Sequence, residues 1–513
     1  MTTTAETEPG RATGHQAREV EIAIIGAGFS GLGMAIRLKE KGIEDFTILE
    51  RGDDVGGTWH WNTYPGCACD VPSHLYSLSF APNPDWSRTY SLQPEIRNYL
   101  QRTADDFGIR PHVRFGCDVT GASWDQGIGR WEIKTSGGVI RARVLLAGLG
   151  PLFEPRTPEI PGLDGFEGPA FHSARWNHDV DLAGKKVAVI GTGASAIQFV
   201  PEIQPKVSEM RVFQRSAPWV MPHTARDVTA AERRIYRAFP AAQRAMRSAI
   251  YGARELLVFG FVKRPRLMRL VEKIARHHMR SQLSDPELIR KATPDYTIGC
   301  KRILPSNKWY PALSQPNVEL VTDPISEARP NSVLTADGTE LEADVIIFGT
   351  GFHVTDMPIG GLIRGREGQT LEESWDGSAK ALLGTSFPGF PNLFMLLGPN
   401  TGLGHNSMVY MIESQITYIL RALESIRGRE SAAIEARSEA VAAYTERIDE
   451  RMKGTVWSTG CSSWYQDETG RNSALWPDWT WRFRHNTSRF DPEHYERHTA
   501  ALTEASAAAK VSA

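Results

Sequence analysis

The pattern of apolar and polar positions near the start of the chain predicts a strand, a glycine turn, a helix and a second strand. The segment Glu21–Ile25 is rich in branched apolar residues, residues 30–41 follow a helical pattern, and Phe46–Leu49 is a second apolar run that ends at Glu50. A strand, a helix and a second strand in this order predict a βαβ unit.

The same order returns later in the chain. Lys186–Ile190 is a predicted strand, Ala196–Ile203 a predicted helix and Met210–Phe213 the next strand. The glycine that opens this second unit, Gly191, lies about 165 residues after Gly26 of the first. Two such units predict an α/β protein with two doubly wound, Rossmann-like dinucleotide-binding domains, one for each of two nucleotides.

The remaining pattern predicts how the chain is divided. Residues 229–291 are predicted as helices in which arginines alternate with large apolar residues, strands return at 318–320 and 343–348, and residues 431–453 are predicted as one long helix. The predicted division is a disordered tail over 1–19, a first nucleotide domain over 20–150 and 385–513, a second over 151–228 and 292–384, and a helical insertion over 229–291.

Composition excludes several classes of protein. The chain has 513 residues, which predicts several domains, and its formal net charge of -2 gives no basic excess for binding nucleic acid. The sequence contains no run of about 18 apolar residues, so it predicts no membrane span. The apolar run Leu256–Val262 lies beside Lys263, Arg264 and Arg266, which leaves a weak interfacial membrane contact open.

The cysteines predict a reducing compartment. Five is an odd number and the five are scattered over a long chain, which argues against a disulfide framework and for a cytoplasmic protein. Cys67 and Cys69 are separated by one residue, so they do not form a CxxC redox pair. No CxxC…CxxC or HExxH pattern predicts a metal site.

The first glycine motif carries the signals of a nucleotide site. Gly26, Gly28 and Gly31 follow a predicted strand and open a predicted helix, and the acidic Glu50 ends the next strand. Glycines let the backbone approach a pyrophosphate, the helix N-terminus supplies N–H groups, and a carboxylate can accept from ribose hydroxyls.

The second motif reads Gly191-Thr-Gly193-Ala-Ser195-Ala196, with alanine at the third glycine position. No acid follows its second strand; Arg215 and Ser216 stand there instead. An acid would repel a 2′-phosphate, whereas arginine and serine can bind one, so this motif favours NADPH over NADH. A solvent-exposed Arg215 without a ligand is the alternative.

Two further stretches are ambiguous on their own. The loop from Gly56 through Gly57, Thr58 and Trp59 to Asp70 suits either the edge of a flat cofactor or an aromatic core. The stretch from Phe166 to Asn177 contains His172, which alone is more often a structural histidine than a catalyst.

Together these stretches resemble the type I Baeyer–Villiger monooxygenases. The spacing FxGxxxHxxxW over residues 166–176 and the pattern GGTWxxNxYPGxxxD over residues 56–70 are similar to fingerprints of that family, and the resemblance extends from about residue 20 to 495. Ser463-Trp464-Tyr465 and Gly470-Arg471-Asn472 resemble the branch acting on aryl or aliphatic ketones, such as 4-hydroxyacetophenone monooxygenase. Asn177 departs from the Pro or Asp that is usual after the fingerprint tryptophan.

The resemblance implies bound FAD, NADPH as reductant, and O₂ and a ketone as substrates. In the family a flavin C4a-peroxide converts the ketone to an ester or lactone, and sulfides are often oxidised too. By the same resemblance, Arg302 is the active-site arginine and Asp70 the carboxylate that orients it. Lys301 matches a residue that contacts NADPH, Trp464 a mobile-loop aromatic over the nicotinamide, and Trp59 an aromatic of the cofactor pocket.

The resemblance also implies roles outside the catalytic pair. His172 is expected in the linker between the nucleotide domains, where it would couple domain motion to catalysis. The insertion is expected to help shape a substrate tunnel. Its candidate lining residues are Leu256, Leu257, Phe259 and Phe261, although packing in the core is the more common role for any one of them.

Three other functions compete with this interpretation. A heteroatom monooxygenase on the same scaffold would oxidise sulfides or amines but no ketone. A pyridine-nucleotide disulfide reductase would need a redox cysteine pair, and the spacing of Cys67 and Cys69 is wrong for one. A non-catalytic flavoprotein would not need both Asp70 and Arg302.

Overall fold

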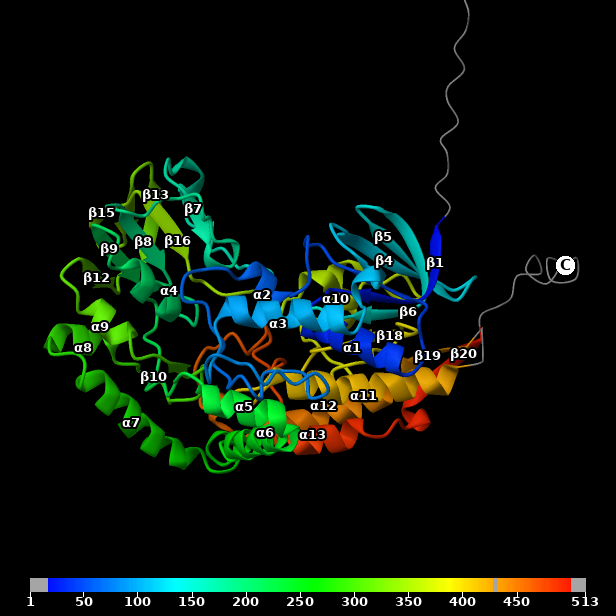
Figure 1. The fold of residues 1–513 in the computed structure, drawn as a ribbon. Coiled ribbons are helices and arrows are strands. Elements are labelled where there is room, and N and C mark those ends of the chain that lie inside the picture. The colour runs from blue at the N-terminus through cyan, green and yellow to red at the C-terminus, as the bar shows by residue number, and fades with distance from the viewer. Residues whose placement is uncertain (1–16, 428–431, 500–513) are drawn as a thin grey trace, which may run out of the picture.

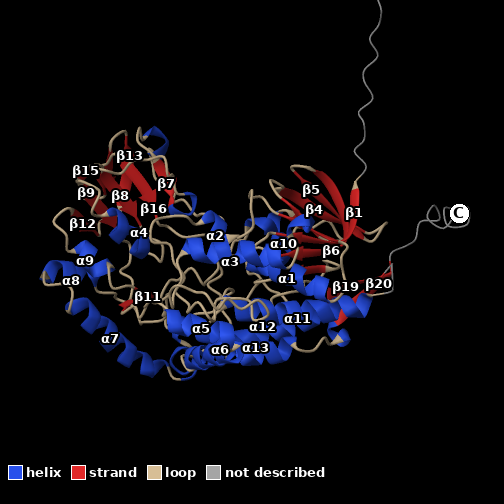
Figure 2. Cartoon of the chain, in the orientation of Figure 1, coloured by secondary structure: helices blue, strands red, loops and turns tan. Residues whose placement is uncertain are grey.

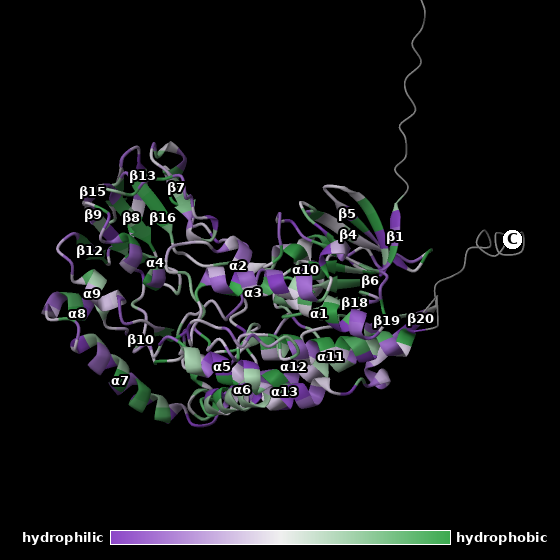
Figure 3. Cartoon of the chain, viewed as in Figure 1, coloured by the Kyte–Doolittle hydropathy of each residue, from purple (hydrophilic) through white to green (hydrophobic). Residues whose placement is uncertain are grey.

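The computed structural model describes residues 17–427 and 432–499, so most of the predicted N-terminal tail lies outside the described residues. Two β-sheets stand apart on one side of the molecule, and helices line the opposite side (Figures 1 and 2). Much of the ribbon in the strands of both sheets is coloured as hydrophobic (Figure 3), as expected for buried strands.

The first sheet has eight strands, in the order β17-β4-β5-β6-β1-β2-β3, with β18 also paired to β6. The long strand β6 pairs with β5 through its first half and with β18 through its second half, beyond Arg143. The strands are β1 Arg18–Ile25, β2 Phe46–Leu49, β3 Val113–Arg114, β4 Val119–Asp125, β5 Arg130–Thr135, β6 Gly138–Ala147, β17 Ile363–Arg364 and β18 Leu393–Met395.

The second sheet has five strands in the order β12-β9-β8-β16-β7, and every neighbouring pair is parallel. Its centre is buried on both faces, since all four residues of β16 and the last four of β8 are buried. The strands are β7 Ala170–His172, β8 Lys186–Ile190, β9 Glu209–Phe213, β12 Val318–Val321 and β16 Val345–Phe348. The strands β13 Ile325–Arg329, β14 Ser332–Thr335 and β15 Glu340–Glu342 form a small antiparallel sheet.

Two helices begin directly after the glycine motifs, as predicted. α1 (Phe29–Glu40) follows β1 and α4 (Ala196–Ile203) follows β8. α1 packs against α11 (Met408–Ile426) so closely that a Cβ at Gly33 would lie 3.1 Å from Ile416 Cδ1. The late helix α11 and strand β18 therefore lie against the first sheet.

Of the other helices, α2, α3 and α10 lie between or beside the two sheets, and α5, α6, α7, α12 and α13 lie along the opposite side (Figure 2). The other helices are α2 Thr58–Trp61, α3 Gln93–Asp106, α5 Ala230–Ala238, α6 Pro240–Glu255, α7 Met268–Arg280, α8 Pro286–Ala292, α9 Trp309–Leu313, α10 Leu371–Trp375, α12 Ser438–Met452 and α13 Thr480–Thr487. Short strand pairs join β10 Val220–Met221 to β11 Leu304–Pro305 and β19 Ala432–Ala436 to β20 Tyr495–Thr499.

Two stretches differ from the predicted elements. Residues 432–436 form β19 rather than the start of a long helix, because they pair with β20, and Ile434 becomes buried in that pairing. Ile363–Arg364 pairs with β4 of the first sheet, although the predicted division assigned residues up to 384 to the second domain. In both places a partner distant in sequence decides the structure.

Two antiparallel connections join the nucleotide domains. Residues 149–158 leave the first sheet and residues 349–357 return from the second, and Pro155 forms a bridge with Phe352. Arg156 N–H donates to the Gly351 carbonyl at 2.9 Å, and His353 N–H donates to the Glu154 carbonyl at 3.1 Å. The domains are therefore connected by two antiparallel segments that are hydrogen-bonded to each other.

One of the four tunnel candidates in the helical insertion packs in the core, and the other three do not. Leu256, Leu257 and Phe259 are exposed, and Phe261 alone is buried, where it packs against Trp457 at 5.8 Å between ring centroids. An apolar run read from sequence does not reveal which side of a helix meets the core. Within the described ranges, no helix combines the length and apolar composition needed to cross a bilayer.

Candidate active site

The first glycine motif forms a tight backbone approach at the end of β1. A Cβ added at Gly31 would lie 1.9 Å from the Gly26 carbonyl oxygen, and one at Gly57 would lie 2.8 Å from Gly28 Cα. The N-terminus of α1 has no capping side-chain hydrogen bond and no acidic residue in its first turn. Its N–H groups and helix dipole therefore suit the negatively charged pyrophosphate of a dinucleotide.

Glu50 at the end of β2 holds this glycine loop in place. The side chain is buried, and its two oxygens accept N–H groups of Ala27 and Gly52, each at 2.7 Å. A carboxylate oxygen can accept more than one hydrogen bond, so both oxygens keep capacity for ribose hydroxyls. Glu50 thus has a structural role that the motif alone did not reveal.

The second motif repeats this arrangement on the other sheet. Gly191 has φ of +105°, and a Cβ there would lie 2.5 Å from the Gly349 carbonyl oxygen. Ala196 opens α4, whose N-cap residue Ser195 makes no capping hydrogen bond, and no acid lies in the first turn. Gly193 is exposed between them, so the backbone is open to a ligand.

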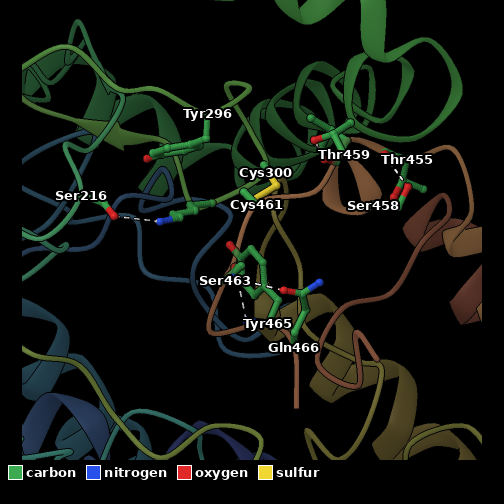
Figure 4. Close-up of a disulfide and its surroundings, with 12 residues drawn as sticks. Ser216, Tyr296, Cys300, Thr455, Ser458, Thr459, Cys461, Ser463, Tyr465 and Gln466 are labelled. Atoms are coloured by element: carbon green, nitrogen blue, oxygen red, sulfur yellow. Dashed lines mark hydrogen bonds between the residues drawn. A yellow bond between two sulfur atoms is a disulfide. The ribbon is translucent and has the colours of Figure 1, made fainter. Parts of the chain in front are cut away.

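A cationic group from a distant segment joins the second motif. Lys301 Nζ donates to Ser216 Oγ at 3.3 Å (Figure 4) and lies 4.7 Å from the centre of the Tyr296 ring. Burial and the charge of Arg215 lower the pKa of Lys301, which places Arg215 in the same electrostatic environment. The structure therefore gathers Arg215, Ser216 and Lys301 into one group beyond β9.

The loop over residues 56–70 connects the two domains. Gln198 of α4 receives a hydrogen bond from Tyr64 Oη at 2.9 Å and donates to the Ala68 carbonyl at 3.1 Å. Near the loop's start, Thr58 opens α2, and the buried Trp59 donates from its indole to Tyr76 Oη at 3.2 Å. The loop thus begins at the first glycine motif and ends against the second domain.

Asp70 and Arg302 meet at the end of this loop. Arg302 Nε donates to Asp70 Oδ2 at 2.9 Å, and Nη2 donates to the same oxygen. Burial would raise the pKa of Asp70, but the charge and hydrogen bonds of Arg302 outweigh it and lower that pKa. The charge of Asp70 in turn raises the pKa of Arg302. Arg302 and Asp70 keep 31% and 23% of their side-chain surface exposed, so a ligand can reach a pair that stays fully charged.

Neighbours hold this pair in position. Arg254 of α6 donates from Nη2 to the backbone carbonyl of Asp70 at 2.9 Å. Leu304, two residues after Arg302, pairs with Val220 in the short β10–β11 sheet, and its N–H donates to the Trp219 carbonyl at 2.9 Å. The helical insertion and the second domain therefore both fix the approach of Arg302 to Asp70.

Tyr465 is a site residue that sequence reasoning did not single out. Its side chain is fully buried beside the ion pair, where burial raises its pKa to about 12 and the nearby Arg302 charge opposes the rise. Trp464, the predicted loop aromatic, is exposed and lies 4.1 Å from the Tyr465 ring, centroid to centroid. The Ser463-Trp464-Tyr465 motif was the available signal for Tyr465, whereas no motif marked Arg254.

A disulfide between Cys300 and Cys461 corrects the expectation of fully reduced cysteines. It joins the segment bearing Lys301 and Arg302 to the loop bearing Trp464 and Tyr465, across a sequence separation of 161 residues (Figure 4). An odd count of scattered cysteines carries no information about which two meet in space. The argument for a reducing compartment therefore loses its basis.

Cys67 and Cys69 are buried free thiols in the loop next to Asp70. Burial raises the pKa of Cys67 to about 12 and that of Cys69 further. A thiol with a raised pKa is a poor redox nucleophile. Their chemistry, as well as their spacing, is unlike that of a disulfide reductase.

His172 lies at the end of β7, an edge strand of the second sheet, rather than within a linker. Its Nδ1 accepts the N–H of Ala174 at 3.0 Å, and its ring packs against Phe352 of the returning connection. Burial lowers its pKa to about 4, so the ring is neutral at neutral pH. Nearby, Trp176 of the same fingerprint packs against Phe199 of α4.

This fold and site define a nucleotide-dependent oxidoreductase built from two dinucleotide-binding domains, with an arginine–carboxylate pair at their junction. A family model described as pyridine nucleotide-disulphide oxidoreductase matches residues 23–231, which span both glycine motifs. A Baeyer–Villiger monooxygenase of Streptomyces coelicolor is 54% identical over 93% of this chain and 92% of its own length. One of Pseudomonas aeruginosa is 47% identical over 95% of this chain and 93% of its own length.

Solved structures agree with these relatives. The closed crystal structure of cyclohexanone monooxygenase is 29% identical, with a TM-score of 0.85 over 94% of this chain and 100% of that chain. Oxidised steroid monooxygenase bound to NADP is 32% identical, with a TM-score of 0.83 over the same shares. The chain belongs to the Baeyer–Villiger monooxygenase family.

Proposed function

We propose that the first glycine motif binds FAD and the second binds NADPH, and that the enzyme uses them with O₂ to convert ketones to esters or lactones. The N-termini of α1 and α4 have no capping side-chain hydrogen bond, so each can bind a pyrophosphate. At the first motif, Gly28 and Gly57 also lie closer together than a Cβ would allow. When bound, the cofactors supply hydride transfer and oxygen activation. The protein must bind and orient the reactants, exclude water and stabilise developing charge.

The single observation that carries this proposal is the partly exposed ion pair between Asp70 and Arg302 at the junction of the domains. Arginine keeps its charge at any working pH, and its planar guanidinium presents several N–H donors. Asp70 occupies Nε and Nη2 with one oxygen, which fixes the guanidinium and leaves Nη1 free of this carboxylate. Arg302 would thus present a fixed donor to negative charge that develops on a ketone oxygen.

The test is a pair of substitutions at Arg302, assayed on a ketone and on a sulfide. Arg302→Ala is expected to lower ketone oxygenation by about 100- to 1,000-fold, as for loss of a preorganised donor, and to spare part of the sulfide oxidation. Arg302→Lys keeps the positive charge but loses the planar set of N–H donors, so it should retain more ketone activity than Arg302→Ala. Undiminished ketone oxygenation by Arg302→Ala would remove Arg302 from the proposed role.

The group formed by Arg215, Ser216 and Lys301 supports a 2′-phosphate site and hence NADPH. Cations and a hydroxyl beside the second motif match a phosphate dianion, which NADH lacks. Arg215→Ala and Lys301→Ala are each expected to raise KM for NADPH at least tenfold while leaving KM for NADH within about twofold. Equal losses with both nucleotides would contradict this assignment.

We propose that the substrate belongs to the aryl or open-chain aliphatic ketones, as for 4-hydroxyacetophenone monooxygenase. The support is the motif around Trp464 and the Gly470-Arg471-Asn472 stretch. Arg471 holds that stretch in place, since its Nη2 donates to Asn400 Oδ1 at 2.8 Å and its Nε to Asp449 at 2.8 Å. Parallel turnover assays with acetophenones, 2-alkanones and cyclohexanone test the proposal, which fails if cyclohexanone is the preferred substrate.

A further inference from the structure

The helical insertion over residues 229–291 is strongly basic in a chain that is slightly acidic overall. It contains 15 Lys and Arg against five Asp and Glu, a formal net charge of +10, whereas the whole chain has -2. Glu272 and Glu287 pair with Arg276 and Arg290 of the same insertion, and Glu232 pairs with Arg226 just before it. Three basic residues of the insertion pair with acids elsewhere in the chain: Arg237 with Asp85, Arg247 with Glu413 and Lys263 with Asp478. The excess charge is therefore positive and concentrated in one region.

The same insertion exposes large apolar side chains. Phe239, Leu256 and Leu270 keep 66%, 62% and 65% of their surface exposed. Further exposed members of this group are Ile235, Met246, Leu257, Phe259, Leu267 and Ile274. Single exposed apolar residues are normal, but a group of this size in one region indicates an interaction surface.

The helix α7 shows how apolar and basic residues are combined. Leu267, which directly precedes α7, and Leu270 and Ile274 within it recur at a spacing of three and four, which places them on one face. Arg266, Arg269 and Lys273 are exposed and follow the same spacing one residue earlier, beside that face. The opposite face packs inward through Met268, Ala275, His278 and Met279, which are buried. An amphipathic helix with a basic border is typical of binding in a membrane interface.

The neighbouring α13 extends this surface with an aromatic residue. Tyr251 of α6 and Thr480 of α13 approach to 3.1 Å between their hydroxyl oxygens, and Phe259 packs edge-on against Trp479 at 5.2 Å between ring centroids. In Figure 1, α6 and α13 lie together along the side opposite the sheets, and α7 continues along the same rim. Trp481 of α13 is exposed there, with the Arg482 guanidinium 5.3 Å from its ring centre. Tryptophan favours the boundary between water and lipid.

We propose that this surface, formed by the exposed faces of the insertion and Trp481, docks the enzyme on an anionic lipid bilayer. Anionic headgroups complement the exposed basic residues of the insertion, such as Arg266, Arg269 and Lys273, and the exposed Phe, Leu and Ile side chains enter the acyl boundary. The inner side of the insertion meanwhile contacts the site, since Arg254 of α6 holds the Asp70 carbonyl. Docking goes beyond the proposed reaction and does not depend on it.

The test uses the full-length holoenzyme and flotation with lipid vesicles. Vesicles of phosphatidylcholine alone are compared with vesicles that also contain phosphatidylglycerol, at low and high NaCl. Binding is expected to the anionic vesicles at low salt and to fall at high salt, because salt screens the charge. The double substitutions Leu270→Ser with Ile274→Ser, and Arg269→Glu with Lys273→Glu, should each weaken binding at least tenfold.

A matched control separates docking from general surface effects. Ile128 is 43% exposed on the hairpin between β4 and β5, far along the chain from the insertion, and Ile128→Ser should bind like the parent enzyme. All variants should keep the circular dichroism spectrum and the Tm of the parent enzyme, which report that they fold. Binding to neither kind of vesicle, equal binding to neutral and anionic vesicles, or unchanged binding by both α7 variants would each overturn the proposal. So would self-association of the enzyme that these substitutions abolish, since a second copy would then be the occupant.

Discussion

Asp70 and Arg302 are 232 residues apart in sequence, and only the fold brings them into contact. The motifs around them were enough to predict the pair through a family resemblance, but nothing in either local sequence indicates the other residue. Tyr465 and Arg254 were not predicted as site residues at all. Tyr465 lies in a motif that was singled out for Trp464, and Arg254 lies in a basic helix that matches no motif. Residue chemistry can be read from sequence, whereas the partners of a residue require the fold.

At the residue scale, Asp70→Asn tests whether the carboxylate positions Arg302. The amide keeps the size of the side chain but removes its charge, so the guanidinium loses its strongest partner. Ketone oxygenation should fall by about tenfold or more. The rate at which NADPH reduces bound FAD, measured as the loss of flavin absorbance, should change less. Equal losses in both steps would assign Asp70 to cofactor binding instead.

The burial of His172 predicts a dependence of stability on pH. Its pKa is about 4 in the folded protein and about 6.5 in an unfolded chain. The unfolded chain binds more protons between these values, so stability is fully present above about pH 6.5 and decreases as the pH falls towards 4. The loss attributable to this group reaches about 3 kcal/mol at most.

Replacing His172 with Asn should therefore reduce the decrease of Tm between pH 7 and pH 5. The exposed His277 on α7 provides the control, since His277→Asn should leave that decrease as it is in the parent. The measurement is thermal unfolding at several pH values. A pH dependence that is the same for all three proteins would show that protonation of His172 does not contribute.

At the scale of elements, the pattern of apolar positions was most reliable where most residues of a segment are buried. Phe46–Leu49, Lys186–Ile190 and Ala196–Ile203 agree with the structure residue for residue. The prediction was wrong at residues 432–436, which join β20, and for the exposed leucines of the insertion. These segments depend on partners distant in the chain, which local periodicity does not report.

The close contact between Gly28 and Gly57 in the first domain predicts that an alanine at residue 57 lowers FAD binding. Gly57→Ala would place a Cβ 2.8 Å from Gly28 Cα, at a residue with φ of +53°. Gly42 has φ of +70°, but no described atom lies within 4 Å of a Cβ added there, so Gly42→Ala adds only the backbone strain. Purified Gly57→Ala should contain little FAD, and Gly42→Ala should contain as much as the parent. Similar FAD content in both would contradict the proposed approach of the backbone to the cofactor.

At the scale of the whole molecule, two nucleotide domains, the loop over 56–70 and the helical insertion converge on one ion pair. Two repeated βαβ signals were sufficient to predict both domains. The Cys300–Cys461 disulfide was not predictable, because pairing depends on the packing of loops that share no pattern. The disulfide links the segment that carries Arg302 to the loop that carries Tyr465, and it therefore restricts how far these two segments can move apart.

Breaking this disulfide should loosen the junction. A cross-link that closes 161 residues stabilises by up to about 5 kcal/mol in the chain-entropy description. Cys461→Ser, or incubation with dithiothreitol, should lower Tm and speed proteolysis within residues 454–472. Dithiothreitol should have no further effect on Cys461→Ser. An identical Tm with and without reductant in the parent enzyme would contradict the prediction.

The most direct test of the account is product analysis with ¹⁸O₂. Purified enzyme is supplied with FAD, NADPH and an aryl ketone, and the products are identified by mass spectrometry. The expected product is an ester that carries one oxygen atom from O₂ and forms only when NADPH is present, and Arg302→Ala should form much less of it. NADPH consumption without ester across the ketone series, together with an oxidised sulfide, would contradict ketone oxygenation and favour a heteroatom monooxygenase.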